Sequence, residues 1–358
     1  MSFDFYGRLK NLRDKLEHDN LDAVIVSKEA NVTYYSGFRG DSTVLIIGKN
    51  FKLLITDGRY TEQARQQAKD FALIEQNEGL YKKIADEIKI LGCKKIGVEG
   101  LVMTISQHNY LRKNTDSVEF KLIELDTLRQ VKDSAEVEKI RRACEIADGA
   151  FEKILSVIKP GISELDIAAD LEYFMRRLGS EKPSFTTIVA SGWRGSLPHG
   201  TATDKIVQSG ELVTMDFGAT FEGYCSDITR TICVGHASDE QRKIYNAVLD
   251  AQLYGLEIIS AGKSGSEIDS VVRQRLTDNG YGEYFIHGLG HGVGLEIHEE
   301  PRLSRLSKCK NLRPNMIVTD EPGAYIEKFG GVRIEDTVLV TEDKAQPLTR
   351  SVKTLIEL

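Results

Sequence analysis

Short apolar runs alternate with amphipathic segments along the first third of the chain. The runs are rich in Val, Ile and Leu, which is typical of buried strands, and the segments between them have helical periodicity. The predicted strands are residues 23–26, 43–47, 53–56 and 95–98, and the predicted helices are residues 60–71 and 82–91. Before them, Leu9, Leu12 and Leu16 recur at helical spacing among charged residues and predict an amphipathic helix. Strands that alternate with helices are typical of an α/β domain.

A long amphipathic helix is predicted at the start of the remaining chain. Asp133 or Ser134 can cap it, and the Lys-Pro-Gly sequence at 159–161 would end it. Ser163 can cap a second helix that runs to about residue 178. The apolar stripe of the first helix consists of Val137, Ile140, Cys144, Ala147, Phe151, Leu155 and Ile158. We therefore place a domain boundary near residue 130, between residues 1–129 and residues 130–358.

The second domain contains a candidate internal repeat. A helix, a breaker at 159–161 and the sequence Ser-Glu-Leu-Asp at 163–166 are followed by a second helix, a breaker at 263–265 and Ser-Glu-Ile-Asp at 266–269. Chance similarity between amphipathic helices is the alternative. A true repeat predicts two similar αα/β halves that face each other, and such an interface is a natural place for a site.

The bulk composition excludes several classes of protein. Hydrophobic residues make up 41% and charged residues 28%, as in soluble globular chains, and a net charge of −7 without a basic stripe argues against a nucleic-acid partner. No apolar segment resembles a signal peptide or reaches 18 residues, so we expect no membrane span. The five cysteines are scattered without a CxxC pair, which argues against a disulfide framework or zinc cluster. We therefore expect a cytoplasmic protein.

The first candidate chemistry is a pair of aspartates, Asp216 and Asp227. Both lie in runs that resemble the two strands of one hairpin, with its turn at residues 220–223. The two are equidistant from a centre between residues 221 and 222, so we expect them directly opposite each other, with Cβ atoms about 4.5–5.5 Å apart. Two carboxylates at that range repel unless a cation lies between them. The alternative, a turn acid beside a solvated acid, is not excluded by this pair alone.

A second acidic pair, Glu321 and Glu335, repeats the pattern. Both are equidistant from Lys328, and the Phe-Gly-Gly sequence at 329–331 would supply the turn. One acidic pair by itself indicates nothing. Two such pairs, each across a predicted hairpin and each in one half of the candidate repeat, indicate one shared site.

A glycine-rich segment between the two pairs carries His291. Glycines at 288, 290, 292 and 294 let the backbone approach a ligand closely, although a lone histidine among glycines is more often a turn or core residue. Four of the chain's seven histidines, His199, His287, His291 and His298, flank the acids, and this concentration favours a site. Four carboxylates and one imidazole suit Mn²⁺ first, with Co²⁺, Fe²⁺ or Zn²⁺ as alternatives, and four acids can neutralise two dications.

The chain from about Ala135 onwards resembles the pita-bread metallopeptidases, which include methionine aminopeptidase, prolidase and aminopeptidase P. The family's ligand segments match Gly-His-Gly at 290–292, Thr-Asp-Glu-Pro-Gly at 319–323 and Gly-Val-Arg-Ile-Glu-Asp-Thr at 331–337. The resemblance implies an α/β N-terminal domain, then an α+β catalytic domain of pita-bread fold with a pseudo-two-fold internal repeat, and two bound divalent ions. The implied metal ligands are Asp216, Asp227, His291, Glu321 and Glu335.

The resemblance is greater to the Xaa-Pro enzymes than to the methionine aminopeptidases, which generally lack so large a domain in front. Residues 31–38 are the clearest match to the N-terminal domain, and His199, His287 and His298 match three further histidines of the Xaa-Pro enzymes. Arg194 stands where many aminopeptidase P sequences have Asn. Creatinases share the two-domain plan but lack the metal ligands.

The resemblance implies cleavage of the peptide bond before a proline. Aminopeptidase P activity on proline-containing peptides is our first interpretation and prolidase activity the second; a binding protein on an inactive peptidase scaffold is the remaining alternative. We expect Glu321 to move the proton, His298 and His199 to contact the substrate carbonyl and proline, and His287 to orient the substrate. Arg333 is expected to support the acids, with a surface ion pair as its alternative role. By analogy with the family we also expect a homodimer.

Overall fold

The computed structural model describes residues 3–358 of the chain. Their contacts divide into two compact units, residues 3–129 and residues 130–358. The two are described separately below.

The N-terminal unit is built on one mixed six-stranded sheet in the order β4-β3-β2-β1-β5-β6. Its central strand β1 is buried along its whole length and pairs antiparallel with β2 and parallel with β5. The strands are β1 (Ala23–Val26), β2 (Val44–Gly48), β3 (Lys52–Thr56), β4 (Ala72–Glu75), β5 (Lys95–Val98) and β6 (Glu119–Leu122). The helices are α1 (Phe5–His18), α2 (Glu29–Ser36), α3 (Thr61–Gln67), α4 (Leu80–Leu91), α5 (Ile105–Asn114) and the 3₁₀ helix η1 (Asp126–Arg129).

The predicted α/β character of this unit is confirmed, and the four apolar runs identified in the sequence form β1, β2, β3 and β5, whereas β4 and β6 were not predicted. The short helix α2 was not predicted because its side chains do not follow an amphipathic pattern: five of its eight residues are buried. Gly37, with φ of 75°, ends that helix in the left-handed conformation that glycine adopts readily.

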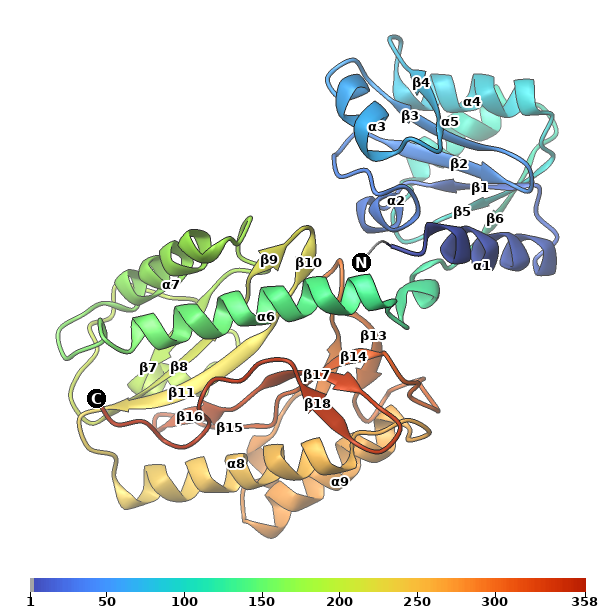
Figure 1. Ribbon diagram of the computed structural model, residues 1–358. Coiled ribbons are helices and arrows are strands. Elements are labelled where there is room, and N and C mark those ends of the chain that lie inside the picture. The colour runs from blue at the N-terminus through green and yellow to red at the C-terminus, as the bar shows by residue number, and fades with distance from the viewer. Residues whose placement is uncertain (1–2) are drawn as a thin grey trace. The chain divides into compact units, whose positions relative to one another are not determined.

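The second unit contains two pairs of helices, each followed by strands. Helices α6 (Ser134–Ile154) and α7 (Glu164–Leu178) lie on one side of the strands, and α8 (Asp239–Ile258) and α9 (Gly265–Asp278) lie on the other (Figure 1). Three strands form a sheet in the order β11-β8-β7, five form a sheet in the order β13-β12-β14-β17-β18, and two hairpins, β9–β10 and β15–β16, complete the unit. This arrangement confirms the predicted pita-bread fold with its internal repeat.

The second unit also contains the short 3₁₀ helices η2 (Gly192–Ser196), after β7, and η3 (Gly282–Tyr284), after α9. The strands are β7 (Ile188–Ser191), β8 (Glu211–Phe217), β9 (Thr220–Phe221), β10 (Tyr224–Cys225), β11 (Ile228–Val234), β12 (Gly290–Gly292), β13 (Glu299–Leu303), β14 (Ile317–Asp320), β15 (Gly323–Ile326), β16 (Gly330–Arg333), β17 (Asp336–Val340) and β18 (Ala345–Pro347).

The helix boundaries follow the capping residues of the sequence. Asp133 caps α6 and Ser163 caps α7, and both form capping boxes in which the third helical residue binds back to the cap. The first helix ends at Ile154, about one turn before the predicted breaker, because residues 155–157 form a turn. The N-cap of α9 is Ser264, so this helix begins two residues earlier than the sequence repeat suggests.

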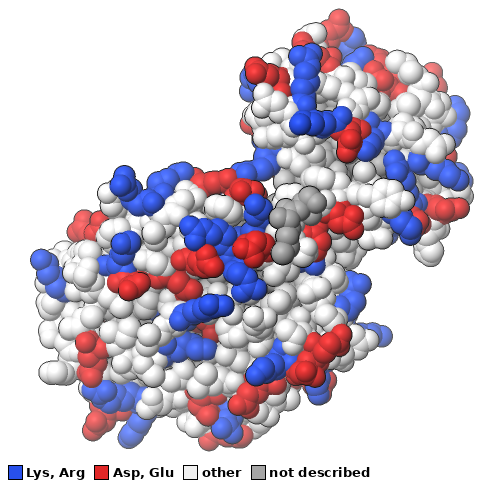
Figure 2. Space-filling model, viewed as in Figure 1, with Lys and Arg blue, Asp and Glu red and all other residues white. Residues whose placement is uncertain are grey.

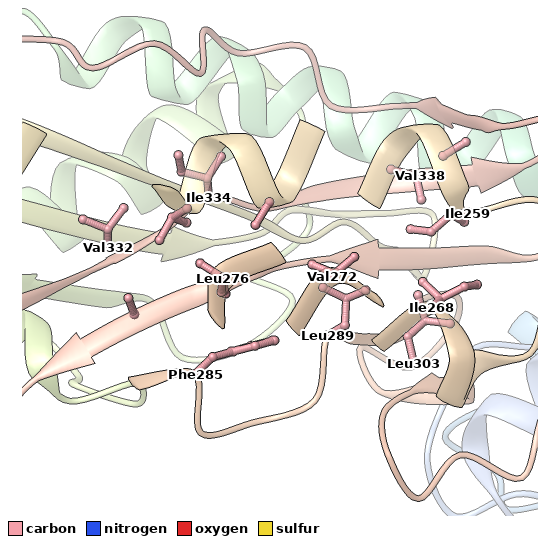
Figure 3. Packing of buried hydrophobic residues seen from close by; sticks show 14 of the residues in the cluster. Ile259, Ile268, Val272, Leu276, Phe285, Leu289, Leu303, Val332, Ile334 and Val338 are labelled. Atoms are coloured by element: carbon pink, nitrogen blue, oxygen red, sulfur yellow. The ribbon is translucent and has the colours of Figure 1, made fainter. Parts of the chain in front are cut away.

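Each half of the repeat has its own hydrophobic core. In the second half, Ile268, Val272 and Leu276 project from α9 towards the strands and pack with residues such as Phe285 and Leu303 (Figure 3). In the first half, α6 and α7 bury their apolar stripes against β7, β8 and β11. These two cores fix the strand edges on which the candidate site is built.

The surface of the described residues carries charges of both signs (Figure 2). On the face shown in Figure 2, Lys and Arg are interspersed with Asp and Glu over the described residues. Within residues 3–358, no helix combines the length and apolar character needed to cross a membrane.

Candidate metal centre

The hairpin that carries Asp216 has a different register from the one predicted. Asp216 pairs with Thr229, not with Asp227, so the prediction that the two aspartates lie directly opposite is wrong. The reason is the turn: Glu222 and Gly223 have φ of 47° and 86° and form a two-residue turn, which moves the centre of the hairpin by one residue. Asp227 lies just before β11, and both aspartates still line one cavity.

The hairpin between the two glutamates has the predicted centre. Strands β15 and β16, and outside them β14 and β17, pair symmetrically about Lys328, although residues 327–329 form the turn and Gly330 and Gly331 belong to β16. Glu321 and Glu335 occupy the interruptions between these strand pairs. There the backbone of Glu335 turns to Thr229 of the other half, with its N–H donating to the Thr229 carbonyl at 3.1 Å. The two halves of the repeat therefore meet at this acid.

His291 lies in β12 and points its ring at the acids. Its Nε2 is 3.6 Å from Asp227 Oδ2 and 3.5 Å from Glu321 Oε1. Its Nδ1 lies 3.1 Å from the Gly292 carbonyl oxygen and donates to it, which leaves the Nε2 lone pair facing the carboxylates. The flanking glycines are required here, since a Cβ at Gly290 would clash with the Thr319 carbonyl oxygen.

Three of the five predicted ligands lie close enough together to hold one metal ion. One ligand atom each of Asp227, His291 and Glu335 lies within 4.8 Å of the other two, and all three residues are buried. Burial, and after it the charge of Glu335, raises the pKa of Asp227 well above its usual range; burial and Glu321 do the same for Glu335. Burial raises the pKa of Glu321 to about 8 and lowers that of His291 to about 3.

This electrostatic arrangement fits a divalent cation. Clustered buried carboxylates are stable as anions only beside positive charge, and a neutral imidazole with a free nitrogen lone pair is a good metal ligand. Asp216 adds a further acceptor: its Oδ1 is buried and has no hydrogen-bond partner among the described residues. The donor set is rich in oxygen, as expected for Mn²⁺ or a similar ion.

Arg333 holds the other oxygen of Asp216. Its Nη2 donates to Asp216 Oδ2 at 2.6 Å, its Nε to Thr229 Oγ1 at 2.9 Å and its Nη1 to the Tyr325 hydroxyl at 2.8 Å. Thr229 in turn donates to Glu335 Oε2 at 2.6 Å. Arg333 is 2% exposed, so it is not the surface ion pair considered as its alternative role.

Tyr325 extends this network to His287 and was missed in the sequence. The Tyr325 hydroxyl accepts from Arg333 and donates to His287 Nε2 at 2.8 Å, while His287 Nδ1 donates to the Gly288 carbonyl at 2.8 Å. Burial, as the largest cause, lowers the pKa of His287 to about 4, so the ring is neutral at physiological pH. Tyr325 had no distinct signal in the sequence, because Ile326 and Phe329 of the same hairpin are also large.

The cluster opens into a cavity of about 780 Å³. His199, His287 and His298 all line it, as do Asp216, Asp227, His291, Glu321 and Arg333. The His298 ring stacks edge-on against His291, with centroids 4.3 Å apart. Arg302, which sequence reasoning did not single out, also lines the cavity, together with Phe185, Ile188 and Ile297 as apolar wall.

Comparison with known proteins identifies relatives along the whole chain. Residues 138–342 match Metallopeptidase family M24, and residues 8–131 match the Creatinase/Prolidase N-terminal domain. The chain is 41% identical to the Xaa-Pro dipeptidase of Pyrococcus furiosus, over 98% of this chain and 99% of the relative.

Two solved structures have the same fold. A Xaa-Pro dipeptidase from Bacillus anthracis has a TM-score of 0.96 and 43% identity, covering 99% of this chain and 100% of the other. An X-Pro aminopeptidase from Thermotoga maritima has a TM-score of 0.91 and 39% identity, covering 98% and 100%.

Proposed function

The chain belongs to metallopeptidase family M24, and from this premise we propose that it hydrolyses the peptide bond between an N-terminal residue and a following proline. The observation that carries the proposal is a single cavity in which three histidines face a buried cluster of acids and one further histidine. The relatives named Xaa-Pro dipeptidase and X-Pro aminopeptidase support the preference for proline.

The proposed metal ligands are Asp216, Asp227, His291, Glu321 and Glu335. Four carboxylates balance the charge of two divalent cations, and the oxygen-rich set favours Mn²⁺. When bound, such a pair polarises the scissile carbonyl and lowers the pKa of water enough for attack at neutral pH.

The proton transfers are assigned to Glu321. Its carboxylate lines the cavity beside His291, where it can take a proton from the attacking water. The same group then protonates the proline nitrogen as the peptide bond breaks. Thr319 Oγ1 donates to Glu321 Oε1 at 3.0 Å, and Glu321 Oε2 lies 4.0 Å from His287 Nδ1.

The three remaining histidines bind the substrate. We expect His298, beside His291, and His199, which lines the same cavity, to donate hydrogen bonds to the carbonyl oxygen as it gains negative charge. His287 is neutral and fixed by Tyr325, which suits it to orient the substrate without adding charge.

A dipeptidase is the second candidate, and Arg302 favours it. The Arg302 guanidinium lines the cavity, and no hydrogen bond or ion pair joins it to the residues described. A free proline carboxylate could pair with this cation, whereas a longer peptide would have an amide there. Kinetics on Ala-Pro, Ala-Pro-Ala and Met-Ala-Ser with Mn²⁺ test both possibilities. Turnover of Met-Ala-Ser without cleavage of either proline peptide would overturn the proposed function.

A further inference from the structure

The placement of His199 depends on the backbone of the loop that carries it. This segment, residues 191–203, is called the His199 loop below. The His199 ring is exposed and lines the cavity, yet no hydrogen bond or ion pair joins it to any residue in the described range 3–358. His287 differs, because Tyr325 and the Gly288 carbonyl hold its ring directly. The backbone of the His199 loop therefore sets where this side chain enters the cavity.

A buried carboxylate at the start of α7 holds both ends of this loop. Glu164 is 0% exposed. Its Oε1 accepts from the Ser191 backbone N–H at 2.7 Å and from the Ser191 hydroxyl at 2.8 Å. Its Oε2 accepts from the Thr203 backbone N–H at 3.1 Å and from the Thr203 hydroxyl at 2.9 Å. One side chain thus closes a loop of 13 residues at its base.

Arg194 neutralises this carboxylate and reaches the segment next to His199. Its Nη1 pairs with Glu164, and its Nη2 donates to the Thr201 carbonyl at 2.8 Å. A buried carboxylate is strongly unfavourable unless it is paired and hydrogen-bonded, and the guanidinium fork satisfies both conditions. A lysine in this place has one compact ammonium group and lacks the planar fork that spans two acceptors.

The opposite half of the repeat has a similar pair. Asp269 and Arg273 of α9 form a buried ion pair at 2.9 Å. Arg273 donates to the carbonyls of Phe285 and His287, at 2.5 and 2.7 Å, and Asp269 accepts from the Leu289 N–H at 3.0 Å. Phe285 and Leu289 pack close to α9 in the same region (Figure 3). Glu164 is the first residue of α7, whereas Asp269 is the fifth residue of α9. The two ion pairs are therefore alike because each holds a loop that carries a histidine, although the acids occupy different helix positions.

We propose that Glu164 and Arg194 are positioning residues for His199, acting through the loop they close. The inference rests on the proposed function, since it assigns His199 a role in substrate binding. It explains why arginine at 194 suits this chain: the residue is a buried loop anchor and does not line the cavity. Asp269 and Arg273 act in the same way on residues 285–289, the segment that carries His287, with a smaller effect because Tyr325 and the Gly288 carbonyl already hold the His287 ring.

The test is a double-mutant cycle between Arg194→Lys and His199→Ala, read as kcat and KM on the best proline peptide with Mn²⁺. We expect Arg194→Lys to lower kcat/KM about tenfold in the wild-type background and less than about twofold in the His199→Ala background, because coupled residues are not additive. Arg194→Lys combined with His287→Ala should be additive. Arg275→Met is the control, because it removes an exposed ion pair with Asp250 that lies outside both loops. This variant should leave kcat/KM unchanged.

Equal losses from Arg194→Lys in both backgrounds would mean a general structural role and would overturn the proposal. Hydrogen exchange of the backbone gives a readout that needs no activity. Arg194→Lys and Glu164→Gln should each speed exchange in residues 191–203 and leave residues 285–289 unchanged, and uniform or absent changes contradict the inference. If the wild type cleaves no proline peptide, the proposed function fails, and this exchange measurement still decides whether the pair holds the loop.

Discussion

Replacing Arg333 by methionine tests how the acids of the centre are held in place. Arg333 is buried and makes hydrogen bonds to Asp216, Thr229 and Tyr325 at 2.6–2.9 Å. Methionine has a similar length but no donor, so neither oxygen of the buried Asp216 carboxylate would have a hydrogen-bond partner. Removing one partner of a buried pair lowers the free energy of unfolding by roughly 3–5 kcal/mol, and we expect a loss of that size in metal-free protein.

The same variant should be rescued in part by metal. A dication beside Asp216 supplies the positive charge that the Arg333→Met substitution removes, so the loss should shrink when Mn²⁺ is present. The assay is urea denaturation of wild type and Arg333→Met, with and without Mn²⁺, with Arg275→Met as an exposed control. A loss under about 1 kcal/mol, the size seen for exposed pairs, would refute the structural role. A loss that is the same with and without Mn²⁺ would refute the electrostatic link between Asp216 and the metal.

Three further predictions concern the site and the N-terminal unit. Glu321→Gln should lower kcat by more than the roughly 10²–10⁴-fold typical of lost acid–base catalysis, because metal content falls too, as metal analysis would show. His298→Ala should keep full metal content but lose about 3–4 kcal/mol of transition-state stabilisation, measured as kcat/KM. Burial opposes ionisation of Asp126, but a hydrogen bond from Lys28 and the charge of Arg129 outweigh it and hold its pKa below the usual range. Asp126 therefore adds stability above the unfolded pKa, about 4, which is lost as pH falls through the folded value, and Asp126→Asn should flatten this part of an acid-denaturation curve.

The sequence predicted those parts of the fold that depend on local patterns. Asp133 and Ser163 cap their helices as expected because a cap needs only its own first turn. The centre at Lys328 was predicted correctly, since the strands on both sides run without a bulge. The centre of the other hairpin was wrong by one residue, and its pairing therefore by two, because the choice of turn depends on backbone conformation at Glu222, which has a positive φ despite its side chain.

Long-range contacts were beyond sequence reasoning. The role of Arg333 as a partner of Asp216 spans 117 residues, and the Arg194–Glu164 pair spans 30. No local period or spacing encodes which charged residue of a strand turns inward to meet an acid of another element. Arg194 was noticed only as a departure from a family pattern, and its buried ion pair gives that departure a physical explanation.

Metal stoichiometry and activity, measured together on wild type and Asp227→Asn, test the central claim most directly. The account predicts about two divalent ions per wild-type chain and cleavage before proline, as in two-metal hydrolases. Asp227→Asn should bind less metal and lose most of its activity, because Asp227 lies 3.6 Å from His291 within the buried ligand group. If Asp227→Asn keeps both metals and full activity, or if the wild type binds no metal, the proposed dinuclear peptidase centre is wrong.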